Sequence, residues 1–135
     1  MLYRKDKKRF VHLRHILGVP FILLPLIPMV IFDIALEIYH QVSFRLYGID
    51  LVKRKNYIVF DRGWLSYLNL TEKLYCIYCS YANGFLAYAV EIAGRTEEYW
   101  CGIKHKLFPG YVQPWHHKNF AEYGDREDFL RKYVN

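Results

Sequence analysis

Three cysteines and one histidine fall into two close pairs, and these residues are the best suited to chemistry in the chain. The pairs are Cys76-x2-Cys79 and Cys101-x3-His105, and the sequence has no other cysteine. Thiolate and imidazole groups paired in this way fit the tetrahedral Cys3His arrangement that usually holds zinc. The sequence therefore predicts a zinc site at Cys76, Cys79, Cys101 and His105. Iron is the second choice, because thiolates also hold iron.

A site closed by four protein ligands has no open coordination position, so its expected role is to stabilise the fold. In the alternative interpretation, the cysteines are buried as small apolar residues and His105 is unrelated to them. A catalytic alternative arises because Glu97, Cys101 and His105 recur every four residues. Glu97 could then orient a metal-bound water. Ordinary solvation of Glu97, or pairing with Arg95 or Lys104, is the favoured prediction.

Two further histidines, His116 and His117, follow Trp115. They could bind metal or act in acid–base chemistry. Adjacent residues point in different directions on regular structure, however, so we favour a surface or core role for them. The sequence has no deaminase signature, phosphate-binding glycine loop, Ser/His/Asp signature or dinucleotide fingerprint. We therefore predict no catalytic residue and identify no small-molecule substrate, and an enzymatic role is the less favoured one.

The net charge of +6 lies entirely in the first part of the sequence. Residues 1–55 hold ten Lys and Arg against four acidic residues, whereas residues 56–135 hold nine of each. Basic residues that flank an apolar segment suit an anionic membrane surface better than a nucleic acid. An odd number of cysteines spaced for metal binding favours a reducing compartment.

Residues 16–32 form a run of seventeen residues without a charge. No cleavage site of small residues follows it, which disfavours a signal peptide. A spanning helix needs about 20 apolar residues, and Pro20, Pro25 and Pro28 interrupt this run. We favour a re-entrant or kinked hairpin that dips into one leaflet. Both basic flanks would then lie on the cytoplasmic side. A kinked full span is the alternative.

Residues 29–46 continue with helical spacing and are predicted to lie in the membrane interface. A polar row containing Asp33, Glu37, His40 and Gln41 is expected to face water. An intramembrane proton or ion site at Asp33 and Glu37 is the less favoured alternative.

The rest of the chain is predicted to be a small helical domain with little β structure. Residues 57–60 suggest a short β-strand, and Thr71 is a candidate cap for a helical turn that delivers Cys76. Residues 80–106 are expected to form one long helix, and residues 125–133 a short one. The predicted fold is thus mainly α. Residues 1–50 form the basic lead, membrane element and interfacial helix, and residues 51–135 form a zinc-clipped domain.

Residues 57–105 contain the elements FDR, EKL-x-C-x-Y-C, NG, RTE-x-YWC and IKH. In these elements the chain resembles a family of small uncharacterised bacterial membrane-associated proteins. The resemblance implies a bacterial origin and brings no activity with it.

Together these features favour a membrane-attached zinc protein that serves as a structural or accessory subunit of a larger membrane complex. We expect it at the bacterial inner membrane, in contact with lipid, with the metal domain on the cytoplasmic side. The alternative is a metal-dependent enzyme or iron redox protein at the membrane interface. Nucleic-acid binding is disfavoured, because residues 56–135 carry no excess positive charge.

Overall fold

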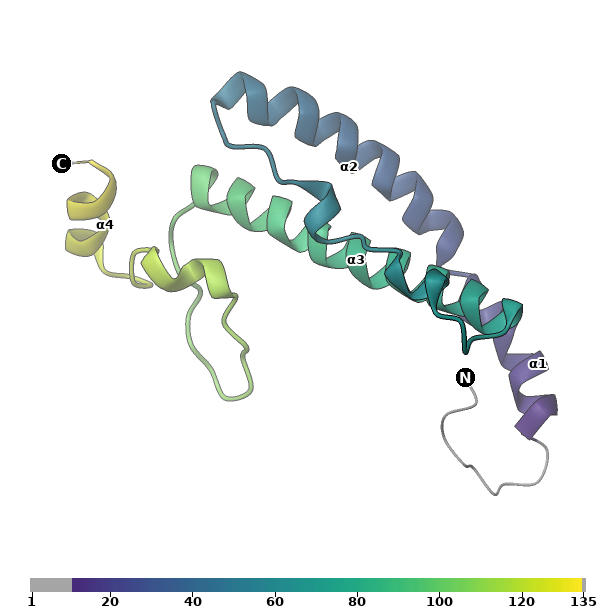
Figure 1. Cartoon of the computed structure of the whole chain (residues 1–135). Coiled ribbons are helices and arrows are strands. Elements are labelled where there is room, and N and C mark those ends of the chain that lie inside the picture. Colours follow the sequence, from purple (N-terminus) through teal and green to yellow (C-terminus); the bar gives the residue numbers. More distant parts are fainter. Residues whose placement is uncertain (1–10, 135) are drawn as a thin grey trace. The chain divides into compact units, whose positions relative to one another are not determined.

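The computed structural model describes residues 11–134, which are mainly helical (Figure 1). This confirms the predicted fold class at that level. Residues 57–60 are not a strand, and the one β-bridge within the described residues joins Ile103 to Ala121. The elements, in chain order, are α1 (Val11–Leu23), α2 (Leu26–Tyr47), η1 (Arg54–Asn56), η2 (Asp61–Trp64), α3 (Leu70–Trp100), η3 (Trp115–Asn119) and α4 (Arg126–Tyr133).

The chain divides into two compact units, Met1–Ala89 and Val90–Asn135, and α3 contributes residues to both. The first unit contains α1, α2, η1, η2 and most of α3. The second contains the end of α3, η3 and α4. The predicted functional division near residue 50 stays a prediction.

A proline kink separates α1 from α2 (Figure 1). Pro25 keeps a right-handed helical conformation, with φ −66° and ψ −14°. The Leu24 amide still donates to the Pro20 carbonyl, and the Met29 amide to that of Pro25. The chain therefore bends at Pro25 but does not reverse, because helical hydrogen bonds continue on both sides of the missing proline N–H. The backbone is thus a kinked helix and not a hairpin, and a full span of the membrane stays a prediction.

The two long helices of the first unit, α2 and α3, run parallel. Asp33 of α2 contacts Tyr81 of α3, and Glu37 and His40 further along α2 contact Tyr88. The polar row of α2 therefore faces the protein, with Asp33 8% and His40 1% exposed. The prediction that this row faces water is wrong. Most exposed residues of α2 are instead apolar, among them Ile27, Ile31, Ile34, Ile38 and Val42.

The segment between α2 and α3 returns along both helices and packs closely on α3 at Gly84. A Cβ atom added to Gly84 would lie 2.5 Å from the Tyr57 carbonyl oxygen and 2.9 Å from the Ile58 Cα. Both are backbone atoms that cannot rotate away, so this contact requires glycine. The segment ends at Asn69, whose side chain accepts from the Glu72 amide while Glu72 accepts from the Asn69 amide. Asn69, and not Thr71, therefore caps α3.

In the second unit, α3 ends earlier than predicted because of Gly102. This residue has φ +64°, a left-handed conformation that suits glycine. The amides of Cys101 and Gly102 both donate to the Glu97 carbonyl and close the helix end. Residues 101–106 therefore leave the helix, and the predicted helix over residues 80–106 is too long by about its last six residues. The predicted short C-terminal helix is confirmed as α4, with Asp125 as its N-cap.

Candidate functional site

The structure places the four predicted zinc ligands in two separate settings. Cys76 and Cys79 lie within α3 of the first unit and are half-buried, on a helix and not on the expected tight turn. Cys101 and His105 follow the end of α3 in the second unit, and both are exposed. Uninterrupted helix runs from Cys79 to Trp100. Within the described residues, these four do not appear as a group of converging ligands. The Cys3His site stays a prediction from the sequence.

The residues that the structure does bring together are Glu97, His116 and His117. Their ligand atoms all lie within 4.8 Å of one another, and they are the one such His, Cys and carboxylate group in the described part of the chain. The Glu97 Oε2 atom is 2.7 Å from His116 Nε2, and its Oε1 atom is 3.0 Å from His117 Nε2. Glu97 lies one turn before the end of α3, and both histidines belong to η3. One carboxylate thus faces two imidazoles with its two oxygens.

Burial sets the electrostatics of this group. The His117 side chain is fully buried and that of His116 is 8% exposed, while Glu97 is 31% exposed. Burial by itself raises the pKa of Glu97. The hydrogen bonds from His116 and His117, together with their charge, outweigh it and hold this pKa below its ordinary value of 4.5. Glu97 is therefore ionised at neutral pH.

The hydrogen-bond pattern fixes where the imidazole protons lie. A carboxylate only accepts, so both Nε2 atoms must carry the hydrogen that they donate to Glu97. The Nδ1 atoms of His116 and His117 are buried and have no hydrogen-bond partner among the described residues. Two imidazoles and a carboxylate in this arrangement are the donor set that zinc and ferrous iron share. A cation bound at the two Nε2 atoms must displace their protons, so its affinity rises with pH.

The ring of a third histidine borders this group. The His105 ring centre lies 5.6 Å from that of His117 and 5.9 Å from that of Tyr111. His117 also stacks on Phe120, which is fully buried. Gly94 packs against His116, because a Cβ atom there would lie 2.9 Å from His116 Nδ1. The site is thus held by aromatic packing and by a glycine on the facing helix.

The sequence interpretation considered Glu97 and the histidine pair separately and did not connect them. We expected Glu97 to be solvated or paired with Arg95 or Lys104, but Arg95 pairs with Glu91, and Lys104 pairs with Glu122. We expected adjacent histidines to diverge, yet in η3 both rings face one carboxylate. The sequence does contain a pair of adjacent histidines after a proline, some twenty residues beyond an acidic helix end. That these residues meet depends on a reversal of the chain between them, which the local spacing of residues does not predict.

A second set of polar residues fills the space between α2 and α3 in the first unit. Arg54 donates to both oxygens of Asp33, over 2.5 and 2.6 Å, and Tyr81 donates to the same carboxylate over 2.8 Å. Burial, followed by the hydrogen bond to Asp33, raises the pKa of Tyr81 to about 12. Burial and Glu37 likewise raise the pKa of Tyr88. Both tyrosines therefore stay neutral and act as donors.

His40 extends this network in a defined direction. The Val52 amide donates to His40 Nε2 over 3.0 Å, so a neutral His40 carries its hydrogen on Nδ1. That Nδ1 lies 2.9 Å from the Tyr88 hydroxyl, which lies 2.9 Å from Glu37 Oε2. The hydrogen bonds thus run from Val52 through His40 and Tyr88 to Glu37. Because its members are partnered, we interpret this network as the device that holds α2 on α3.

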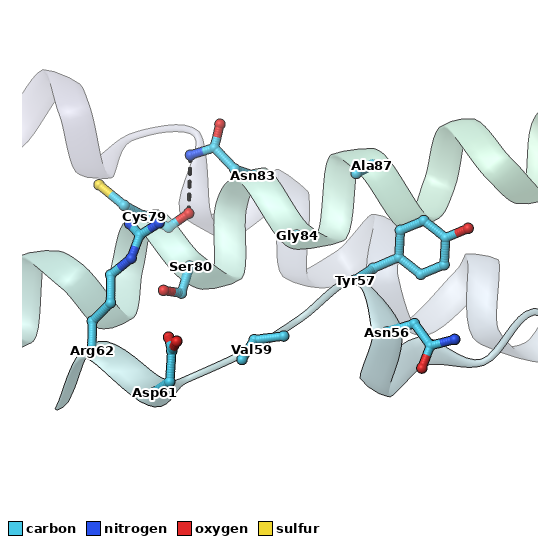
Figure 2. A pocket seen from close by; sticks show the side chains of 10 residues that line it. All are labelled: Asn56, Tyr57, Val59, Asp61, Arg62, Cys79, Ser80, Asn83, Gly84 and Ala87. Atoms are coloured by element: carbon cyan, nitrogen blue, oxygen red, sulfur yellow. Dashed lines mark hydrogen bonds between the residues drawn. The ribbon is translucent and has the colours of Figure 1, made fainter. Parts of the chain in front are cut away.

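The described residues also form a polar pocket beside α3, with a volume of about 570 Å³ (Figure 2). Its lining comes from η2 and the preceding segment on one side and from α3 on the other. Cys79 is part of this lining. The Asn83 side-chain amide donates to the Cys79 carbonyl over 2.9 Å.

By length and composition, Ile16–Tyr47 is long and apolar enough to cross a membrane, with a mean hydropathy of 2.4 in its most apolar window. This agrees with an N-terminal membrane element. Comparisons with protein-family models, with curated proteins and with solved structures found no match to this chain.

Proposed function

We propose that the protein is a membrane-attached metal protein in which Glu97, His116 and His117 hold one divalent transition-metal ion. The observation that carries this proposal is the convergence of two imidazole nitrogens and one carboxylate within 4.8 Å. Zinc is the first choice and ferrous iron the second, because both are held by two histidines and a carboxylate.

Three protein ligands favour a reactive centre over a purely structural one. Structural zinc sites are closed by four protein ligands, whereas catalytic sites keep a position for water or substrate. When bound there, a metal ion supplies Lewis-acid activation of that water or substrate. Glu97 and the two histidines position the centre, and the Phe120 packing keeps the His117 ring away from water. We therefore favour a metal-dependent activity at the membrane over a zinc site that only stabilises an accessory subunit.

Membrane attachment is supported by the exposed apolar residues of α1 and of the first turns of α2. Phe21 is 76% exposed and Ile27 69%, in a segment without charge. From Asp33 onward, α2 is less suited to the hydrocarbon core. There Val52 binds His40 and Arg54 binds Asp33, so the exposed Lys53 and Lys55 lie alongside it. We therefore propose that residues 16–32 are embedded and that the charged half of α2 lies at the membrane surface.

The experiment that tests the metal centre is elemental analysis of the full chain purified in mild detergent and supplied with zinc or ferrous iron. We expect about one metal ion per chain. Glu97→Gln and His117→Ala should lose it, and Glu98→Gln should retain it, because Glu98 is an exposed acid one position along the same helix.

Two further variants separate this centre from the one predicted by the sequence. Cys79→Ser and His105→Ala remove residues of the Cys3His site and leave the Glu97 carboxylate and the His116 and His117 rings in place. Metal that survives Glu97→Gln but is lost in Cys79→Ser would overturn the present assignment and restore the Cys3His site.

A role within a larger membrane complex is a second candidate, favoured by exposed side chains of the second unit. Trp100 and Trp115 are each more than 60% exposed, as are Leu107, Phe108 and Val112. Exposed aromatic and apolar groups are typical of protein contacts. Gentle purification of the native protein should then recover a constant partner, and Val112→Asp together with Phe108→Asp should release it. Unchanged recovery in that variant would contradict this role.

We place the second unit on the cytoplasmic side, because its exposed Cys101 is a free thiol. A membrane-impermeant maleimide should then label Cys101 only after the membrane of expressing cells has been permeabilised, with Cys101→Ser as the control. Equal labelling of intact cells would place this unit outside.

A further inference from the structure

The polar pocket of the first unit has the size of a small-molecule site. Its volume is about 570 Å³, within the range of about 300–1,000 Å³ that ligand pockets occupy. Figure 2 shows Arg62 and Asp61 rising from η2 toward α3, where Cys79 and Ser80 face them. Neither Asp61 nor Arg62 takes part in an ion pair within the described residues. The pocket therefore offers one cation and one carboxylate side by side.

An apolar groove of about 420 Å³ lies next along the same two elements, lined by Phe60, Gly63, Trp64 and Ile77. Its residues alternate along the chain with those of the polar pocket, since Phe60 precedes Asp61 and Gly63 follows Arg62. On α3, Ile77 of the groove lies two residues before Cys79 of the pocket. The same two elements thus carry a polar site and an apolar one, a combination that suits an amphiphile with a charged head and a hydrocarbon tail.

The order of the two sites along α3 agrees with the order of apolar and charged residues along α1 and α2. Near the groove, the Tyr78 hydroxyl donates to the Ile22 carbonyl in the uncharged segment. Near the pocket, Tyr81 donates to Asp33, the first charged residue after that segment. Both sites thus begin next to Tyr78, and the pocket extends further along α3, past Tyr81 and its contact with Asp33. Trp64, which lines the groove, is 89% exposed, and an exposed Trp is typical of the membrane–water interface.

We propose that the pocket and groove bind one zwitterionic phospholipid whose head carries a phosphate and a primary ammonium, as in phosphatidylethanolamine. Arg62 binds the phosphate, because a guanidinium donates two parallel hydrogen bonds to such a group. Asp61 accepts from the ammonium. The first acyl carbons follow Phe60, Trp64 and Ile77 toward the hydrocarbon core.

This inference rests on the membrane attachment proposed above and is independent of the metal centre. The test is a titration of the full chain in mild detergent with short-chain phosphatidylethanolamine, phosphatidylcholine and phosphatidylglycerol, with bound lipid counted by native mass spectrometry. Soluble lipids are used, so the result does not depend on whether the protein sediments with membranes. Phosphatidylethanolamine should bind at least about fivefold more tightly than phosphatidylcholine or phosphatidylglycerol, because those two lipids have no ammonium hydrogen to donate to Asp61.

Matched variants then assign the two charges. Arg62→Gln should weaken binding of all three lipids, and Asp61→Asn should remove the preference for phosphatidylethanolamine. Lys55→Gln, an exposed base outside the pocket, should change neither. Equal affinity for the three lipids in the unmodified protein would overturn the assignment of the head. Free phosphoethanolamine that competes as well as the lipid would overturn the role of the groove, and unchanged binding in Arg62→Gln would overturn the site itself.

Discussion

At the residue scale, Glu97 has two uses that compete for the same atoms. Without a cation, its carboxylate binds the Nε2 hydrogens of His116 and His117 and so holds η3 against the end of α3. A cation in the centre replaces those hydrogens. The hydrogen-bonded arrangement already brings the three ligand groups within 4.8 Å of one another before a cation binds.

The lowered pKa of Glu97 predicts a pH dependence of stability. The folded state favours the ionised carboxylate of Glu97. The resulting stabilisation is fully present above the ordinary pKa of 4.5 and is lost as pH falls through the lower pKa of the folded state. The free energy of unfolding of the metal-free protein should therefore decrease in acid more steeply than that of Glu97→Gln. Chemical denaturation in detergent at a series of pH values measures both. Parallel curves for the two proteins would show that Glu97 is not paired in solution, and Glu98→Gln should follow the unmodified chain.

The residue scale is also where prediction from sequence was weakest. Ligand spacing predicted two cysteine and histidine pairs, but Gly102 ends α3 before His105 and puts that residue in a loop. The Glu97 centre depends on residues 101–114 reversing the chain, which no spacing rule registers. Helices were easier, because apolar periodicity and the Asp125 cap are local. The polar row of α2 was recognised but assigned to water, since its partners Arg54, Tyr81 and Tyr88 come from distant segments.

At the scale of elements, two glycines allow close packing against α3. Gly84 admits the backbone of Tyr57 and Ile58, and Gly84 and Tyr57 both line the polar pocket. Gly94 admits the His116 ring. A glycine at an exposed position inside a helix lowers helix stability by up to about 1 kcal/mol relative to alanine. At Gly84 and Gly94 the close contacts leave no room for a larger residue.

Gly94→Ala should therefore impair the metal centre. Its Cβ atom would lie 2.9 Å from His116 Nδ1 and 3.1 Å from Cγ, so the ring must shift away from Glu97. We expect the affinity for zinc to fall by about tenfold, the scale at which misoriented ligands act. Competition with a coloured chelator measures this. Gly18→Ala is the matched helical control, because nothing lies within 4 Å of a Cβ atom there. An unchanged affinity in Gly94→Ala would mean that His116 does not bind the metal.

At the scale of the whole molecule, the distribution of apolar and polar surface separates two parts of the N-terminal segment. Phe21, Ile27 and Ile31 are exposed and belong to the uncharged run. Asp33, Glu37 and His40 follow, with their polar groups satisfied inside the protein. This distribution is the reverse of that in a water-soluble amphipathic helix, in which the apolar face is buried and the polar face is exposed. It suits a chain whose apolar outer face meets lipid.

Replacing Phe21, Ile27 and Ile31 together with Ser should therefore weaken membrane attachment and leave the fold intact. These side chains make little contact within the protein, and each loses roughly 1.5–3 kcal/mol of transfer free energy when it no longer enters an apolar phase. Alkaline carbonate should release more of this variant than of the unmodified protein, at equal helix content by circular dichroism. The matched control replaces Leu107, Phe108 and Val112, which are equally exposed but belong to the second unit. If alkaline carbonate released the control variant but not the first variant, a protein partner, and not lipid, would hold the chain at the membrane.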